Sequence, residues 1–558
     1  MTIAGVVLYF FAVCLFALFP FPVPTDTAVL FYRQDYWLLM AECGLLLAAS
    51  VRPGDQASRL ELPQIALPLI ALGLIVFCYI GGKWFLCGFA VSRDEQMAIF
   101  DSRIFGAGHL VQHLLPFWQA HTAALNTIFM LPAVRPVAWV SGYLPMNAIL
   151  RTAVGLVADP ALTGPLMVAL GLVSLWKCAR LLWPDDREAA VVALLLYIGS
   201  GQVLFAGMTA YAMPAHLAFN LLWLWLFLLK RPLADVGALL VAFVATGLHQ
   251  PLFHPLFAAP ILFTLLLERN WPRVLLFGIG YGAICAFWLE WPGWMHLFIT
   301  GPHSANTAAA TDYFARLRLV ISQGDPMRWR DIGANLLRFF AWQHLLFLPL
   351  MAVGIAATWR NRLAGAFAAS VILPVIIMSV LLSYQGHGFG YRYLHGVIGV
   401  AILLAVFGWR WLAERHGWLR PLFIRATLAG LLVVMPLQAW MAHGFYAPDA
   451  RSDRQIANSG VDYFITGGFD APYSQDLVIN RADLSNRPLR LIAEKLDDTL
   501  IQGICRTGAR VALPTSTFYR PLQTYYYLAQ LPRPDARIAT LSPRLKAAGC
   551  SVAYLDGT

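Results

Sequence analysis

Two neighbouring acids, Asp94 and Glu95, stand directly after a long apolar segment that ends near Ala90. Ser92 lies three residues before Glu95, which is the spacing of a helix capping box and predicts a helix that starts at Arg93. The box accounts for Glu95 and leaves Asp94 free on a fixed turn. A carboxylate held rigidly beside a cavity, where burial tunes its pKa, could act as a general base. The alternative is that both acids only stabilise the N-terminus of the helix.

The residues after these acids predict a short amphipathic helix that lies along a membrane surface. Its apolar face and the glycines that close it are Met97, Phe100, Ile104 and Phe105, then Gly106 and Gly108. Asp101 comes two helical turns after Asp94 and could orient Arg103 or a substrate, although we expect it to face solvent.

Composition identifies the class of protein that must position these acids. Of the 558 residues, 59% are hydrophobic and 13% are charged, and the mean hydropathy is +0.63. A soluble protein could not bury so much apolar surface, so we predict a polytopic membrane protein. The net charge of +10 is interpreted as cytoplasmic loops rather than as a nucleic-acid site. We expect no cleaved signal peptide, because the first apolar run reaches Phe21 without a small-residue cleavage site.

Hydropathy predicts about thirteen membrane spans. They lie near 3–22, 36–51, 64–90, 163–182, 188–207, 212–229, 234–250, 252–267, 274–291, 337–358, 363–383, 393–410 and 421–442. With the N-terminus in the cytoplasm, the short loops on the inner side are all basic, as the positive-inside rule requires. The longer polar segments then lie outside: 91–162, 292–336, 383–392 and 443–558. We therefore expect a multi-pass inner-membrane protein whose outer face does its work.

The chain divides into a transmembrane domain, residues 1–442, and a small soluble periplasmic α/β domain, residues 443–558. In the second domain we expect helices over 487–502 and around 525–528, and strands near 510–513, 537–541 and 551–555. Cys505 and Cys550 lie in this polar region and could form a disulfide in an oxidising compartment, or remain two buried thiols.

The loop resembles the first outer loop of the GT-C membrane glycosyltransferases, and more closely that of the protein O-mannosyltransferase and aminoarabinose-transferase group. In that group an Asp-Glu pair is followed by a hydrophobic residue and a glycine, as in Asp94-Glu95 and then Phe105-Gly106. Short elements elsewhere are similar: Tyr143-Leu144-Pro145, Tyr211-Ala212-Met213-Pro214 and Gly390-Tyr391-Arg392-Tyr393-Leu394. In the family the acidic loop usually follows the first span, whereas here it follows the third.

The resemblance implies a sugar donor carried on a polyprenyl phosphate, with Asp94 as the base of an inverting displacement. The departing phosphate needs cations, and arginine suits it best. Arg392 is the first candidate, with His387, Tyr391 and Tyr393 around it in a glycine-rich turn. Its alternative role is an interface anchor in an aromatic belt. Arg318 and His303 in the second outer loop are further candidates for the substrate cavity.

His249 and His254 flank a proline at the end of a span, with a spacing unsuited to metal on one helix face. We expect them to line the cavity and form hydrogen bonds. His216 and Asn220 are expected to join helix to helix. No cofactor or metal is required, although a divalent ion could bind Asp94 and Glu95. The acceptor, a glycan, lipid or protein, is left open. A lipid or solute transporter, or a non-catalytic envelope-assembly subunit, is the competing hypothesis, but the sequence has no internal repeat of the kind common in transporters.

Overall fold

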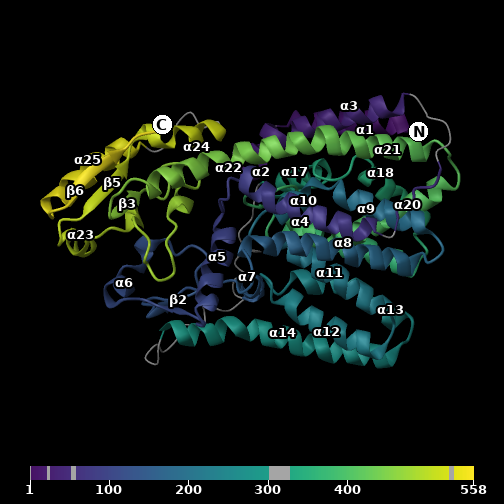
Figure 1. Ribbon diagram of the computed structural model, residues 1–558, viewed down its shortest axis with the longest axis horizontal. Helices are drawn as coiled ribbons and strands as arrows, with labels where there is room; N and C mark the ends of the chain where they lie inside the picture. Colours follow the sequence, from purple (N-terminus) through teal and green to yellow (C-terminus); the bar gives the residue numbers. More distant parts are fainter. Residues whose placement is uncertain are drawn as a thin grey trace.

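The computed structural model describes residues 2–19, 21, 25–51, 58–63, 65–300, 327–526 and 533–557. A bundle of helices that lie mostly along the long axis forms one part of the molecule, and a small α/β unit projects from one end of it (Figure 1). The helices before the long segment 85–162 are α1 (Thr2–Ala17), α2 (Asp26–Leu30), α3 (Tyr36–Ser50) and α4 (Ala66–Trp84).

The remaining helices of the bundle come after that segment. They are α8 (Thr163–Leu182), α9 (Arg187–Ile198), α10 (Gly201–Gly207), α11 (Met213–Leu228), α12 (Pro232–Thr246), α13 (Phe253–Leu267), α14 (Trp271–Thr300), α17 (Arg328–Ala341), α18 (Phe347–Ala357), α19 (Arg362–Leu381), α20 (Ile398–Ala413), α21 (Leu419–Ala429) and α22 (Met435–Ala457).

Six of the described helical stretches are long and apolar enough to cross a membrane, or seven if the bent pair α9–α10 counts as one span. The six are Ala66–Trp84, Pro160–Leu182, Trp271–Thr300, Arg362–Leu381, Arg392–Ala413 and Leu419–Ala457. The prediction of about thirteen spans is therefore not confirmed. Other apolar helices, such as α12 and α18, are shorter than the roughly 20 residues that a span needs, and hydropathy counted them equally.

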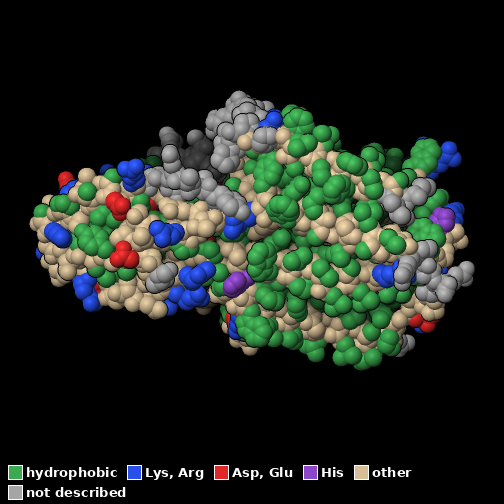
Figure 2. All heavy atoms as spheres, turned by 90° about the horizontal axis from the view of Figure 1, so that it is seen from above, with side chains coloured by type: hydrophobic (Ala, Val, Ile, Leu, Met, Phe, Trp, Pro, Cys, Tyr) green, Lys and Arg blue, Asp and Glu red, His purple; other side chains and the backbone are tan. Residues whose placement is uncertain are grey.

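The surface agrees with a multi-pass membrane protein. Apolar side chains cover the helical bundle, whereas acidic and basic side chains gather on the α/β unit and at the far end of the bundle (Figure 2). Leu72, Leu240, Ile279 and Leu432 are among the large apolar residues that are mostly exposed on different helices of the bundle. Such a continuous apolar surface suits contact with lipid rather than water.

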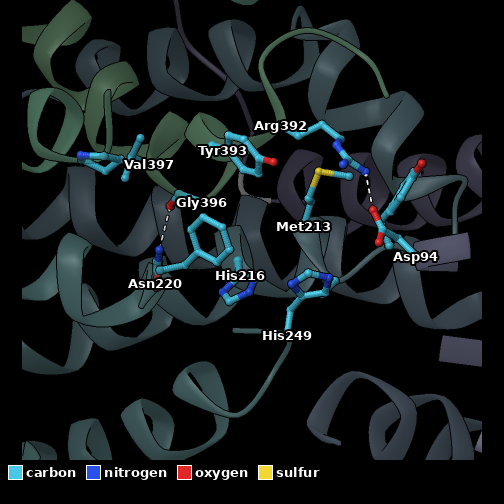
Figure 3. A pocket seen from close by; sticks show the side chains of 13 residues that line it. Asp94, Met213, His216, Asn220, His249, Arg392, Tyr393, Gly396 and Val397 are labelled. Carbon is cyan, nitrogen blue, oxygen red and sulfur yellow. Dashed lines mark hydrogen bonds and ion pairs between the residues drawn. The ribbon is translucent and has the colours of Figure 1, made fainter. Parts of the chain in front are cut away.

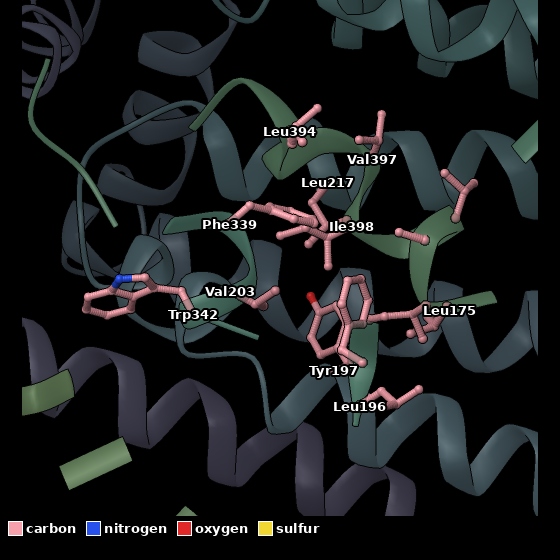
Figure 4. Packing of buried hydrophobic residues seen from close by; sticks show 14 of the residues in the cluster. Leu175, Leu196, Tyr197, Val203, Leu217, Phe339, Trp342, Leu394, Val397 and Ile398 are labelled. Carbon is pink, nitrogen blue, oxygen red and sulfur yellow. The ribbon is translucent and has the colours of Figure 1, made fainter. Parts of the chain in front are cut away.

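A large apolar core joins most of the helices in the bundle (Figure 4). Tyr197 of α9 is completely buried in it and donates a hydrogen bond to the carbonyl oxygen of Val168 at 2.9 Å. Trp342 is likewise buried, beside Phe205 and Phe389. This packing fixes the helix ends that surround the site described below.

The α/β unit, residues 463–555, is built on a four-stranded parallel sheet in the order β4-β3-β5-β6. Its elements are β3 (Tyr463–Thr466), β4 (Leu489–Ile492), α23 (Asp498–Cys505), β5 (Arg510–Pro514), α24 (Arg520–Tyr525), α25 (Pro534–Ala547) and β6 (Ser551–Leu555). A disulfide joins Cys505, at the end of α23, to Cys550 just before β6.

Three details of this unit differ from the sequence-based prediction. Residues 489–492 form a strand rather than the start of a helix, and residues 537–541 belong to α25 rather than to a strand. Strand β3 was not predicted at all. The reason is that strands buried on both faces lack an alternating pattern, so that short apolar runs do not reveal their secondary structure.

The long segment between α4 and α8 packs against the α/β unit. It contains α5 (Arg93–Gly106), β1 (Gln112–His113), α6 (Pro116–Ala120), β2 (Ala138–Trp139) and α7 (Met146–Gly155). Met97, Phe100 and Ile104 of α5 are buried in a cluster with Leu489 and Leu491 of β4. The apolar face of α5 therefore covers protein instead of lying on a membrane surface, which corrects the sequence interpretation. Helix α22 passes residue 442, the predicted domain boundary, without a break.

Candidate active site

The start of α5 is held rigidly on three sides. The Ser92 side chain accepts a hydrogen bond from the backbone N–H of Glu95, which is the predicted N-cap. Arg93 is buried and donates to the carbonyl oxygen of Asn126 at 2.8 Å. Gln96 donates to the carbonyl oxygen of Asp476 in the α/β unit at 3.0 Å. The residue between Arg93 and Glu95 is thereby fixed in position.

That residue, Asp94, forms an ion pair with Arg392. The Oδ2 atom of Asp94 lies 2.9 Å from Nη1 of Arg392, and Oδ1 accepts a hydrogen bond from the hydroxyl of Tyr143. Burial raises the pKa of the Asp94 carboxyl, but Arg392, His249 and the Tyr143 hydrogen bond outweigh burial and leave it below its ordinary value. Asp94 is therefore ionised, with both oxygens engaged.

Arg392 comes from the loop 383–392, which its own side-chain contacts keep closed. Gln385 accepts from the backbone N–H of Arg392 at 2.8 Å and donates to the carbonyl oxygen of Gly390 at 2.7 Å. A Cβ atom on Gly388, whose φ is +147°, would lie 2.3 Å from Cδ of Arg392. A glycine-rich turn can let the backbone approach a ligand closely, but at Gly388 the missing side chain makes room for Arg392 itself.

Arg392 also lies over an aromatic ring, because its guanidinium carbon is 5.1 Å from the ring centroid of Tyr211. Its Nε atom is buried and makes no hydrogen bond with any residue that the structure describes. The guanidinium group thus retains donor capacity beyond its bond to Asp94.

The ion pair lies at one end of a pocket whose empty space, counted together with its open side, is about 620 Å³ (Figure 3). The wall is made by the loop before α11, by α11 itself, by the starts of α13 and α20, and by the middle of α19. The lining residues are Asp94, Tyr211, Ala212, Met213, His216, Asn220, His249, Phe253, Pro374, Arg392, Tyr393, Gly396 and Val397. Charged groups occupy one end, whereas the remainder is mostly apolar, with Phe253, Pro374 and Val397 beside the polar side chains of His216 and Asn220.

Glu95, the second predicted catalytic acid, does not line this pocket. Its carboxylate accepts hydrogen bonds from the backbone N–H of Ala210 at 3.1 Å and from the hydroxyl of Tyr446 at 3.0 Å. Burial raises the pKa of Glu95 to about 7. The side chain therefore ties α5 to the loop before α11 and to α22, and a backbone hydrogen bond from Ser92 also lowers the pKa of Glu95, as in the predicted capping box. Within the described ranges, no group of three or more His, Cys, Asp or Glu side chains is placed to hold a metal ion.

His249 and His254 occupy different positions. His249 lines the pocket, and its ring stacks on that of Tyr143 at 4.1 Å between centroids. Burial lowers the pKa of His249 to about 4, so the imidazole is neutral. His254 lies behind the wall, 2.7 Å from Oδ1 of Asn220 and 2.8 Å from the hydroxyl of Tyr281. Both are placed to support the cavity, but only His249 faces it.

The other predicted phosphate ligands divide in the same way. Tyr393 lines the pocket and stacks on Phe253. His387 packs against Phe445 and Tyr473, away from the pocket lining, and burial lowers its pKa to about 3. Tyr391 is completely buried and also does not line the pocket. Arg318 and His303 lie outside the described residues.

Sequence reasoning assigned no role to Tyr143 or Tyr211, although each makes a direct contact in the site. Both stand two or three residues before a proline at the start of a helix, Pro145 before α7 and Pro214 in the first turn of α11, and this position was the available signal. It also assigned Asp101 to a solvated face, which is wrong. Asp101 is buried and accepts from the backbone N–H of Ser141 at 3.0 Å and from its hydroxyl at 2.5 Å.

No known family model matches the sequence, and no curated protein matches it. The similar solved structures include two of ArnT from Cupriavidus metallidurans. The structure titled as bound to undecaprenyl phosphate has 14% sequence identity and a TM-score of 0.48, and the match covers 75% of this chain and 84% of that chain. The apo structure has 12% identity and a TM-score of 0.45, with 85% and 89% covered. The chain is similar to these two structures over most of its length.

Proposed function

We propose that the chain is a membrane glycosyltransferase that transfers a sugar from a polyprenyl-phosphate carrier to an acceptor. The observation that carries this proposal is the Asp94–Arg392 pair at the polar end of a pocket whose other end is apolar. A ligand that fits such a pocket has an anionic head and a hydrocarbon tail. A prenyl phosphate has both, and the apolar bundle gives it a membrane from which to enter.

Arg392 would bind the phosphate and, in doing so, release Asp94. A guanidinium group that binds two anionic groups shares its N–H donors between them. The Nε atom of Arg392 has no hydrogen-bond partner in the described part of the chain. As the donor phosphate takes donors from Arg392, the negative charge on Asp94 loses its nearest compensation. Its carboxylate then becomes a stronger base at the moment when the donor is in place.

The chemical step is a single displacement. Asp94 takes the proton from an acceptor hydroxyl or amine, whose oxygen or nitrogen forms a bond to the anomeric carbon of the sugar. The bond between that carbon and the phosphate oxygen breaks, and its electron pair leaves with the phosphate. Arg392 stabilises the charge that develops on the phosphate. Tyr143 holds Asp94 in orientation through its hydroxyl.

The acceptor would approach from the side of α5 and the α/β unit, because Asp94 belongs to α5 and this helix packs against that unit. No metal is required in this scheme, since one phosphate leaves and one guanidinium group neutralises it. The reaction would take place at the outer face of the inner membrane, where the α/β unit projects.

The test is turnover of polyprenyl-phosphate sugars by the full-length protein in nanodiscs, offered with a panel of sugars and with membrane extracts as acceptors. Asp94→Asn should lower turnover by about 10²–10⁴-fold, the usual contribution of a general base. Asp186→Asn is the matched control, because Asp186 also pairs with an arginine, Arg410 at 2.7 Å, but far from the pocket. It should keep the wild-type rate.

Equal rates in wild-type protein and Asp94→Asn would contradict the assignment of the base. Failure of the wild-type protein to bind any polyprenyl phosphate would contradict the function itself.

A further inference from the structure

His216 is a buried histidine in the wall of the pocket whose hydrogen-bonding groups are unused. It lies in the second turn of α11 and is 5% exposed, and its ring meets the edge of Phe253. Neither ring nitrogen has a hydrogen-bond partner among the described residues. A buried polar group without a partner costs about 1–3 kcal/mol, so it calls for an explanation.

The polar groups next to His216 differ from it. Asn220, one turn later on α11, donates to the carbonyl oxygen of Gly396 at 2.8 Å and contacts His254. His254 in turn contacts Tyr281. These three side chains satisfy one another, so they need nothing from the pocket.

His395 resembles His216 in having both ring nitrogens buried without partners among the described residues. It does not line the pocket, however, whereas His216 does. Position rather than the missing partner therefore distinguishes His216, and His395 provides a matched control.

In the pocket, His216 lies between the Asp94–Arg392 end and the end marked by Asn220 and Val397 (Figure 3). A lipid whose head binds Arg392 and whose chain lies toward Phe253, Pro374 and Val397 must pass this imidazole. His216 and Arg392 line the same pocket, so a phosphate bound at Arg392 lies in the cavity that the imidazole faces.

We infer that His216 donates a hydrogen bond to the phosphate of the lipid carrier, as a second phosphate ligand beside Arg392. This inference rests on the proposed function. A neutral imidazole presents one N–H donor, which a phosphate oxygen accepts. A neutral donor also suits an apolar wall, because a second cation there would have to be kept charged without a carboxylate partner. His216 would thus bind the carrier and the product phosphate alike, whatever the sugar.

The experiment measures binding of two probes, undecaprenyl phosphate and the neutral alcohol undecaprenol, to the full-length protein in nanodiscs. His216→Phe should weaken binding of the phosphate about tenfold, the effect of one hydrogen bond to a charged group. It should leave the affinity for undecaprenol unchanged. His216→Gln, which keeps an N–H donor, should restore most of the affinity for the phosphate, and His395→Phe should match the wild-type protein.

Unchanged affinity of His216→Phe for undecaprenyl phosphate would overturn the inference, and so would equal weakening for both lipids, which would indicate packing alone. If His216→Phe does not fold, His216→Leu takes its place. A loss of affinity for undecaprenyl phosphate alone in His216→Leu, with wild-type-like binding by His395→Phe, would support the inference. Equal losses for both lipids would contradict it. Arg392→Gln separates the two proposals. If Arg392→Gln also leaves the affinity for undecaprenyl phosphate unchanged, the proposed lipid-phosphate site is wrong. If only the His216 variants leave it unchanged, the present inference alone is wrong.

Discussion

Two aspartate–arginine pairs lie near the same loop, residues 383–392, and their surroundings differ. Asp35 and Arg338 are each 1% exposed, and Asp35 also accepts from Nε1 of Trp342 at 2.6 Å. Arg338 donates in addition to the carbonyl oxygen of Gly388 at 3.0 Å. Every group of this pair has a protein partner on several sides, so the pair has no capacity left for a ligand.

The Asp94–Arg392 pair is built from the same residue types but borders a pocket. Its side chains are 15% and 11% exposed, and Nε of Arg392 has no partner in the described part of the chain. The difference teaches that an ion pair with spare donors beside a cavity is suited to exchange partners, whereas a sealed pair with none is suited to hold helices together.

The largest effect should separate the two arginines. Arg392→Gln should weaken binding of undecaprenyl phosphate by about 10–100-fold, because a charge-assisted hydrogen bond to the phosphate is lost. Arg338→Gln should instead lower the free energy of unfolding by about 3–5 kcal/mol, because Asp35 remains buried without its cation. Lipid-binding titrations and chemical unfolding in detergent measure the two quantities. The comparison breaks if Arg338→Gln lowers lipid affinity in protein that is still folded.

The two aspartates should differ in the same direction. Asp35→Asn should destabilise the protein by about 3 kcal/mol, because it leaves buried Arg338 uncompensated. Asp94→Asn should change the free energy of unfolding by less than about 1 kcal/mol. The reason is that Arg392 borders the pocket, where its charge stays in contact with solvent when Asp94 is removed. Thermal unfolding of both variants beside wild-type protein measures this. Equal destabilisation would mean that Asp94 is mainly structural.

Binding of the lipid phosphate should be coupled to a proton. The pKa of Asp94 is depressed while Arg392 faces it, and it should rise when a phosphate draws Arg392 away. Proton uptake should therefore accompany binding of undecaprenyl phosphate at acidic pH and diminish at higher pH. Calorimetry in two buffers of different ionisation enthalpy measures the uptake. Asp94→Asn is the control that removes the contribution of Asp94, and an unchanged uptake in that variant would place the proton elsewhere.

The smallest effect concerns Asp101 of α5, which forms no ion pair with an arginine in the described part of the chain. Burial raises its pKa to about 7 in the folded protein, against about 3.9 when unfolded. The folded state thus holds its proton more tightly, so stability should fall as the pH rises from about 4 through about 7. The melting temperature should be higher at pH 5 than at pH 8, and Asp101→Asn should reduce this difference. An unchanged difference would show that other groups set the pH dependence.

Much of the local structure around the site was predictable. Ser92 and Glu95 placed the start of α5 correctly, because a helix N-cap depends on residues within one turn. The apolar positions of α5 were also correct, but what they cover was not, since periodicity says which face is buried and never against what. For the same reason the sequence did not predict strand β3, and it predicted a strand at residues 537–541, which are helical.

The sequence by itself determined the membrane-protein class, the helix that carries Asp94 and the residue types suited to its chemistry, because composition and capping act over short stretches of chain. Only the tertiary structure decided that Asp94 meets Arg392, that Glu95 and His387 turn away from the pocket and that Tyr143 and His216 face it. Asp94 and Arg392 are far apart in the chain and meet only because the bundle packs α5 against the loop before α20. Such contacts depend on how distant segments share one buried volume, which no local pattern records.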